Sequence, residues 1–113
     1  MENRPVINVR GLDCSPEVEE KFNTWLNKTH IPMLLKFKGM RRVASYKKMG
    51  DDEQFPKYLA IFEFEDSDAF EEYSKSPELA AAIEEMKVSW PASATCFESK
   101  WRVQYELVES WEK

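Results

Sequence analysis

Apolar residues in the first quarter of the chain recur at helical spacing. The recurring positions are Val18, Phe22, Trp25 and Leu26. This spacing predicts an amphipathic helix with one apolar stripe. Ser15 and Pro16 are the residue types favoured at a helix N-cap and at the first helical position. Pro32 disfavours helical backbone at the residue before it, which predicts that the helix ends near Thr29 or His30. Met33 to Phe37 then forms either an apolar connector or a further turn of helix.

Four other segments have the composition of β-strands. Tyr58 to Phe64 is the strongest, because its apolar residues occupy both alternating faces, as in a strand that is covered on both sides. β-branched residues predict a first strand from Val6 to Val9, and a second follows from Met40 to Met49. Apolar and polar residues alternate from Trp101 to Val108, which predicts the last strand.

Helix-start residues occur twice between the third and fourth predicted strands. Asp66 begins the first helix, and Ser76 followed by Pro77 begins the second. The sequence therefore predicts two helical pieces with a break between them, followed by a loop from Val88 to Ala94.

The predicted order of elements is β-α-β-β-α-β. This is the ferredoxin-like order, an α+β fold in which a four-stranded antiparallel sheet carries its helices on one face and its first and third strands in the middle. Residues 1–113 form a single domain of this kind. The other sheet face is left uncovered, although Tyr58 to Phe64 carries bulky apolar residues on both sides. An apolar patch of that kind predicts a homodimer that packs sheet against sheet.

The amino-acid composition restricts the classes of partner that this chain is expected to bind. The net charge is −5, which disfavours nucleic acid or an anionic membrane as the main partner. No apolar run approaches the ~20 residues of a membrane span, and the N-terminal residues lack the apolar core of a signal peptide. A cytoplasmic protein is expected, in which Cys14 and Cys96 are free thiols. The aromatic content of 13% suits an aromatic-lined cavity.

A cluster around the single histidine carries a family resemblance. The matching residues are Phe22, Trp25, Asn27, His30, Ile31, Pro32 and Gly39, then the second strand, YLAIFEFED and SPELAAA. The pattern resembles the dimeric α+β barrel superfamily and, within it, the EthD-like proteins. The resemblance implies a cofactor-independent enzyme of the cyclase, isomerase, dehydratase or monooxygenase type that acts on an aromatic or polyketide-like small molecule. A non-catalytic small-molecule-binding or stress-response protein and a dimeric accessory protein are the alternatives.

The functional site is predicted around His30. This residue continues the apolar stripe four positions beyond Leu26, so its ring should point toward the sheet. Imidazole titrates near neutrality, which makes His30 the candidate catalytic acid or base. The C-terminal end of a helix favours its charged form, and burial favours its neutral form. Trp25 and Asn27 are predicted to line the pocket; a histidine that only packs and caps the helix is the alternative.

Tyr46 and Glu63 complete the predicted substrate-binding residues. Tyr46 offers a hydroxyl, although such a tyrosine is also a common core or interface residue. Glu63 lies in the most apolar strand, where a carboxylate is costly unless it is paired. It would be a general base, a group that orients His30, or half of a structural ion pair. Its candidate partners are Arg10, Arg42 and Arg102.

No cofactor and no metal site are predicted. One histidine without clustered ligands disfavours a zinc or iron centre. A haem with His30 as its only axial ligand stays open, because one histidine suffices. The acidic run from Asp66 to Glu72 is interpreted as a capped, solvated helix start. The expected ligand is a small apolar or aromatic molecule.

Overall fold

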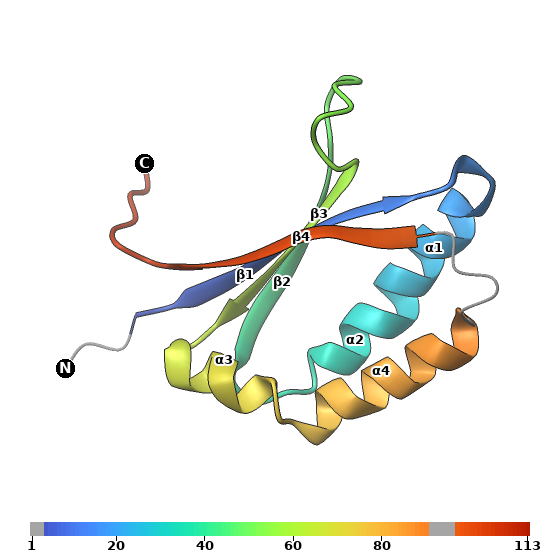
Figure 1. The fold of residues 1–113 in the computed structure, drawn as a ribbon. Coiled ribbons are helices and arrows are strands. Elements are labelled where there is room, and N and C mark those ends of the chain that lie inside the picture. The colour runs from blue at the N-terminus through green and yellow to red at the C-terminus, as the bar shows by residue number, and fades with distance from the viewer. Residues whose placement is uncertain (1–3, 91–96) are drawn as a thin grey trace.

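The sheet has four antiparallel strands in the order β2-β3-β1-β4 (Figure 1). They are β1 (Val6–Cys14), β2 (Met40–Lys47), β3 (Tyr58–Phe64) and β4 (Phe97–Glu106). This is a computed structural model, which describes residues 4–90 and 97–113, except for the side chains of 97–101. The prediction that the first and third strands lie in the middle is confirmed.

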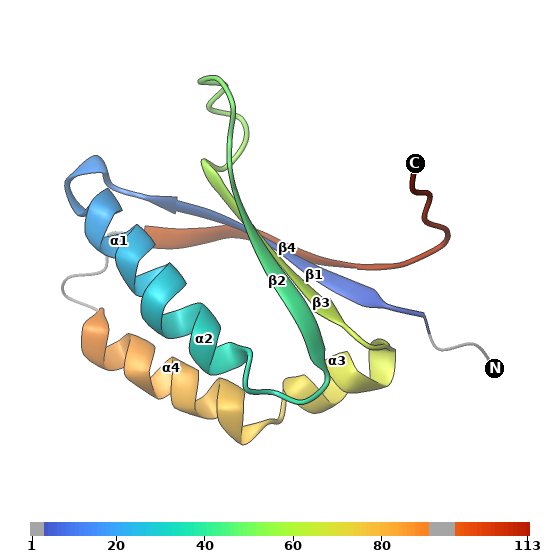
Figure 2. The ribbon, with the colours of Figure 1, turned by 180° about the vertical axis from the view of Figure 1, so that it is seen from behind.

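The helices lie on one face of the sheet (Figure 1; Figure 2). A 3-10 turn (Pro16–Val18), α1 (Glu19–Trp25), a π-helical turn (Leu26–His30) and α2 (Ile31–Leu34) form one run between β1 and β2. The helices α3 (Ser67–Tyr73) and α4 (Pro77–Ser89) follow β3, and α4 packs beside α2. The predicted ferredoxin-like order of elements is confirmed.

Both predicted helix starts after β3 carry side-chain caps. The Asp66 carboxylate accepts a hydrogen bond from the Ala69 N–H at 2.8 Å, and the Ser76 hydroxyl accepts one from the Leu79 N–H at 3.1 Å. Such bonds satisfy backbone donors that the first turn of a helix leaves unpaired. The break between the two helices is confirmed, but α4 runs to Ser89 and so includes the start of the predicted loop. Residues 91–94 of that loop lie outside the described residues.

The predicted end of the first helix is wrong, because the helical run continues past Pro32 to Leu34. The reason is the π-helical turn, in which the Ile31 N–H donates to the Leu26 carbonyl five residues earlier. A proline inside an α-helix lacks an N–H and clashes with the carbonyl four residues before it. A π turn widens the helix at that point, so the ring is accommodated.

The first strand is longer than predicted, because it pairs on both sides. It pairs with β3 as far as Leu12 and with β4 as far as Cys14. Gly11 lies inside the strand, where the register with β4 shifts. A glycine within a strand commonly marks such a bulge.

The core fills the space between the helices and the inner sheet face. Alternation along β3 turns Tyr58, Ala60, Phe62 and Phe64 toward the helices. Phe22 of α1 and Phe64 are fully buried. Trp25 packs with them and is 8% exposed, which confirms that it is a core residue.

Within residues 4–90 and 97–113, no helix lies on the opposite sheet face (Figure 1; Figure 2). We call it the outer sheet face. Register places Ile7, Val9, Leu59, Ile61, Ala44, Tyr46, Val103 and Tyr105 on it. Tyr46 and Tyr105 are more than half exposed, at 51% and 58%. The predicted apolar patch therefore lies on the face that holds Leu59 and Ile61.

Candidate functional site

Among the described residues, two hollows lie between the inner sheet face and the helices, and together we call them the inner cavity. The larger has a volume of about 280 Å³ and is lined by residues that include Asn8, Arg10, Phe62 and Tyr73. The smaller has about 50 Å³ and reaches Trp25 and His30. The two share Arg10 and Phe62 as walls. The inner cavity is therefore the hollow into which the single histidine faces.

The π-helical turn positions His30. The turn lies between α1 and α2, and its last residue turns its ring toward Arg10 and Phe62 on the sheet. The ring stacks on Trp25, with ring centroids 4.6 Å apart and an interplanar angle of 25°. The His30 Nδ1 atom is buried and has no hydrogen-bond partner in the described part of the chain. A buried polar atom without a partner is costly, so this nitrogen is a candidate contact for a ligand.

Burial lowers the pKa of His30 to about 4. The Glu85 carboxylate acts in the opposite direction, and the Arg10 guanidinium lowers the pKa further. Of the two opposing effects considered in the sequence, burial is therefore the larger. At neutral pH the ring is uncharged, so one of its nitrogens accepts a hydrogen bond or a proton.

Trp25, on which the histidine ring stacks, is itself held in place by residues of α4 and by Trp90. The Trp25 Nε1–H donates a hydrogen bond to Glu85 Oε1 on α4 at 2.8 Å. The second Glu85 oxygen accepts a hydrogen bond from the Ser89 hydroxyl. Trp90 packs against Trp25 at 5.9 Å in an edge-on arrangement. The sequence analysis missed Glu85, because only the packing of α4 on the first helical run brings the two residues together.

A polar stripe crosses the inner sheet face at the larger hollow. It consists of Asn8 and Arg10 on β1 and their partners Gln104 and Arg102 on β4. The Gln104 Nε2–H donates to Asn8 Oδ1 at 2.8 Å, and Asn8 is only 5% exposed. The sequence analysis missed Asn8 and Gln104 as site residues. The available signal was polar residues at every second position of both strands, on the side that faces the helices.

The other predicted site residues lie away from the inner cavity. Asn27 is exposed on the π-helical turn and does not line either hollow. Tyr46 and Glu63 lie on the outer sheet face, with the sheet between them and His30. These residues were predicted to lie around His30, and the structure separates them from it. Along each strand, alternate side chains point to opposite faces of the sheet, and Tyr46 and Glu63 belong to the set that points away from the helices.

Glu63 also has a different partner from those expected. Its carboxylate lies 3.4 Å from Arg41 Nε, and both side chains are partly exposed. The register between β2 and β3 shifts next to Arg41, which is the irregularity that the sequence did not reveal. Glu63 lines a hollow of about 500 Å³ on the outer face, together with Tyr105 and part of the C-terminal segment. It does not orient His30.

The hollow beside His30 is small. Its volume of about 50 Å³ holds only a few water molecules, so a haem does not fit against the ring in this arrangement. Within residues 4–90 and 97–113, no group of three His, Cys, Asp or Glu side chains is placed to hold a metal ion. Cys14 has a free thiol, and Cys96 lies outside the described residues. No helix in the described ranges has both the length and the apolarity that a membrane crossing requires.

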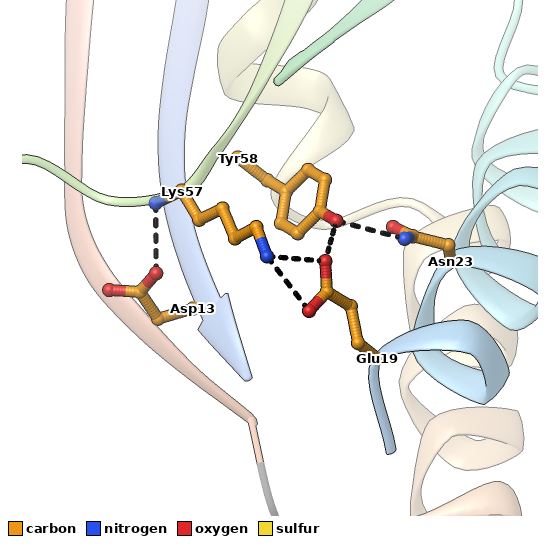
Figure 3. Close-up of polar contacts among 5 residues, drawn as sticks. All are labelled: Asp13, Glu19, Asn23, Lys57 and Tyr58. Atoms are coloured by element: carbon orange, nitrogen blue, oxygen red, sulfur yellow. Dashed lines mark hydrogen bonds and ion pairs between the residues drawn. The ribbon is translucent and has the colours of Figure 1, made fainter. Parts of the chain in front are cut away.

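A second polar group lies at the start of α1, and we call it the Glu19 cluster (Figure 3). It comprises Asp13, Glu19, Asn23, Lys57 and Tyr58. Lys57 Nζ contacts both Glu19 oxygens, at 2.9 and 2.7 Å, and the Tyr58 hydroxyl donates to Glu19 Oε2. The Asn23 amide donates to the Tyr58 oxygen at 3.0 Å, and Asp13 accepts from the Lys57 backbone N–H at 2.8 Å.

The electrostatics of the Glu19 cluster follow from these contacts. The hydrogen bonds from Lys57 and Tyr58 lower the pKa of Glu19. The hydrogen bond to Glu19 raises the pKa of Lys57, and burial raises the pKa of the Tyr58 hydroxyl. No hollow that we describe has both Glu19 and Tyr58 in its walls. The cluster therefore joins α1 to β3 and is not the candidate site.

Comparison with known proteins supports the fold. A family model described as "Domain of unknown function (DUF4286)" matches residues 7–104. Among curated proteins, none matches the sequence. An ethyl tert-butyl ether d (EthD) family protein from Bacillus halodurans has a similar structure, with a TM-score of 0.65 and 16% identity over 91% of this chain and 99% of that chain.

Two further solved structures are similar. One is a dimeric protein of ferredoxin-like fold from Bacteroides fragilis, with a TM-score of 0.60 and 20% identity over 91% of this chain and 96% of that chain. The other is SnoaB, a cofactor-independent oxygenase from Streptomyces nogalater, with a TM-score of 0.64 and 12% identity over the whole of both chains. These likenesses confirm the predicted ferredoxin-like α+β fold.

Proposed function

This chain belongs to the family described as Domain of unknown function (DUF4286), and we propose that its inner cavity binds a small aromatic molecule and transfers a proton through His30 without a cofactor. The observation that carries this proposal is the His30 ring that lines the cavity, whose buried Nδ1 has no hydrogen-bond partner among the described residues. The cofactor-independent oxygenase SnoaB, which has the same architecture, adds support.

The size and lining of the cavity suit a small ligand. The larger hollow, of about 280 Å³, is close to the lower end of the roughly 300–1,000 Å³ that small-molecule sites occupy. Phe62 and Phe70 supply apolar walls, against which an aromatic ring packs favourably. A single-ring molecule fits this volume better than the polyketide-like ligand that the family resemblance also implied.

His30 would act as the base. Its neutral ring would accept a proton from an acidic O–H or C–H of the bound molecule and return it at another atom, so that the enzyme ends unchanged. With a pKa of about 4 the imidazole is a weak base in the empty cavity. Negative charge that develops on the substrate would raise this pKa, because an adjacent opposite charge favours the imidazolium.

A titration of the single histidine by NMR tests the proposal. In the free protein the ring should stay neutral above about pH 5, and a bound phenol should raise its pKa and move its signals. His30→Asn should leave the fold intact and reduce turnover of any substrate found by about 10²–10⁴. Asn27→Ala is the matched control on the same turn, and it should change neither the histidine titration nor the turnover. Histidine signals that ignore a panel of aromatic ligands would contradict the proposal.

The second candidate is a non-catalytic small-molecule-binding or stress-response protein that uses the same cavity. The lowered pKa of His30 favours it, since a weak base contributes little to catalysis. In that case His30→Asn weakens ligand binding, and no substrate in the panel is converted by the wild-type protein.

A homodimer through the outer sheet faces belongs to the same proposal. Ile7, Leu59 and Ile61 form an apolar surface without a helix over it, and a related structure of this fold is described as dimeric. The interface should bury well over ~1,000 Å². Light scattering should give twice the 13.3 kDa of one chain. Ile61→Asp should dissociate or unfold the dimer, and Ile83→Asp, on the exposed side of α4, should not. A wild-type monomer would contradict the interface.

A further inference from the structure

Two arginines face the larger hollow of the inner cavity. Arg10 on β1 and Arg102 on β4 are direct cross-strand partners on the inner sheet face, and both line the hollow. Its lining residues that the structure describes include no aspartate or glutamate. The whole chain has a net charge of −5, so this concentration of positive charge runs against the composition.

Two guanidinium groups stand at directly paired positions of β1 and β4. Like charges at such positions repel, and an anion bound beside both would relieve this repulsion. Burial lowers the pKa of Arg10, and the Arg102 charge lowers it further. The same two residues that cost stability are therefore well placed to hold a negatively charged group.

The other walls of the hollow indicate which kind of molecule would carry the negatively charged group. Phe62, Phe70 and Leu79 form an apolar wall. Burial raises the pKa of the Tyr73 hydroxyl to about 12, so this group keeps its proton and is able to donate it in a hydrogen bond. A planar carboxylate matches the paired N–H groups of a guanidinium, and an aromatic or aliphatic body matches the wall.

We propose that Arg10 and Arg102 form a subsite for the carboxylate of a small aromatic acid, whose ring lies against Phe62 and points toward His30. The inference rests on the proposed function, because it assigns the substrate class of the same cavity. Arg10 lines both hollows, so a carboxylate held there lies at the polar stripe, next to the hollow that reaches the histidine. The arginines would bind and orient the acid, and the proton transfer would remain with His30.

Binding of benzoate, measured by NMR chemical shifts and by calorimetry, tests the subsite. Benzamide has the same shape without the charge, and inorganic phosphate has charge without the ring. Benzoate should perturb the signals of Phe62 and Tyr73 and bind about tenfold or more tightly than benzamide. Its affinity should fall as salt is added. Equal binding of benzoate and benzamide, no binding of benzoate at millimolar concentration, or binding of phosphate alone would each overturn the proposal.

Variants locate the charge that is responsible. Arg102 occupies an exposed position on an edge strand, so the Arg102→Gln variant should fold. The substitution should reduce benzoate affinity about tenfold or more. Arg102→Lys should recover part of the affinity, because a point charge lacks the paired donors of a guanidinium. Lys36→Gln is the matched control, since it removes one exposed positive charge outside the cavity and should change nothing. Full benzoate affinity in Arg102→Gln would overturn the assignment.

The two proposals fail separately. If phenol shifts the His30 signals but benzoate binds no better than benzamide, the cavity and its histidine stand and the carboxylate subsite is wrong. If benzoate binds through the arginines but no ligand affects His30, the subsite stands and the proton-transfer role is wrong.

Discussion

The Glu19 cluster and the inner cavity both place polar groups against the sheet, but the two regions differ in how many of these groups have hydrogen-bond partners. In the cluster, both Glu19 oxygens contact Lys57, and the Tyr58 hydroxyl both donates and accepts (Figure 3). In the cavity, His30 Nδ1 has no partner within the described residues, and two arginines face one another. A closed network stabilises the fold, whereas a buried nitrogen without a partner, such as His30 Nδ1, retains capacity for a ligand.

The histidine and the glutamate also differ in the cause of their pKa shifts. Burial lowers the pKa of His30, which penalises its charged form. Hydrogen bonds lower the pKa of Glu19, because they stabilise its charged form. Both regions are therefore weakened by acid, but for opposite physical reasons and over different pH ranges.

Truncating Trp25 should damage the cavity side of the molecule most. Trp25→Ala removes a core ring, the stacking surface of His30 and the donor to Glu85. Loss of a large buried side chain costs about 3–5 kcal/mol of unfolding free energy. Urea denaturation at fixed protein concentration measures it. A loss below about 1 kcal/mol would mean that the ring faces an empty pocket and serves mainly to stack a ligand.

Acid should weaken the cavity before it weakens the cluster. The folded pKa of His30 is about 4 and its ordinary value is 6.5, so the unfolded chain binds a proton that the folded chain does not. Stability should therefore fall by roughly 3 kcal/mol as the pH drops from about 6.5 to about 4. His30→Gln should flatten this part of the curve of unfolding free energy against pH.

Glu19→Gln is the matched control for that experiment. The lowered pKa of Glu19 gives stability that is present above the ordinary value of 4.5 and is lost only as the pH falls through the lower folded value. The control should therefore keep the loss between pH 6.5 and 4 that His30 causes. If His30→Gln retains the wild-type slope in this range, burial does not control the histidine.

Removing one hydroxyl should have the smallest effect. Tyr58→Phe deletes the donor to Glu19 and the acceptor for Asn23, while the ring stays in the core. A lost hydrogen bond of this kind costs about 1–2 kcal/mol of unfolding free energy. Thr24→Val, which removes a hydroxyl from an exposed position of α1, is the control and should change stability by less than about 0.5 kcal/mol. Equal effects in both variants would show that the cluster does not stabilise the fold.

Local patterns were sufficient to predict most of the fold. The alternation in Tyr58 to Phe64 identified β3, and the caps at Asp66 and Ser76 located the starts of α3 and α4. Such signals act within a few residues, so the chain itself contains them. The end of the first helix was missed, because a π turn that tolerates Pro32 has no equally clear local pattern.

The candidate site was predicted only in part. His30 and Trp25 lie on one helical stripe, so spacing alone placed them together. Glu63 and Tyr46 were grouped with them although they lie on the opposite sheet face. The parity of a strand shows which residues share a face, but it does not show which face the helices cover.

The amino-acid sequence by itself determined the order of elements, the apolar stripe and the single histidine that lies on it. It also contains Gly39, just before β2. Only the tertiary structure explains that glycine, because a Cβ there would lie 2.8 Å from the Ala69 Cβ atom of α3. In the same way, only packing decided that Arg10 and Arg102 face a cavity beside His30. These contacts join residues far apart in the chain, and burial and charge act through space rather than along the sequence.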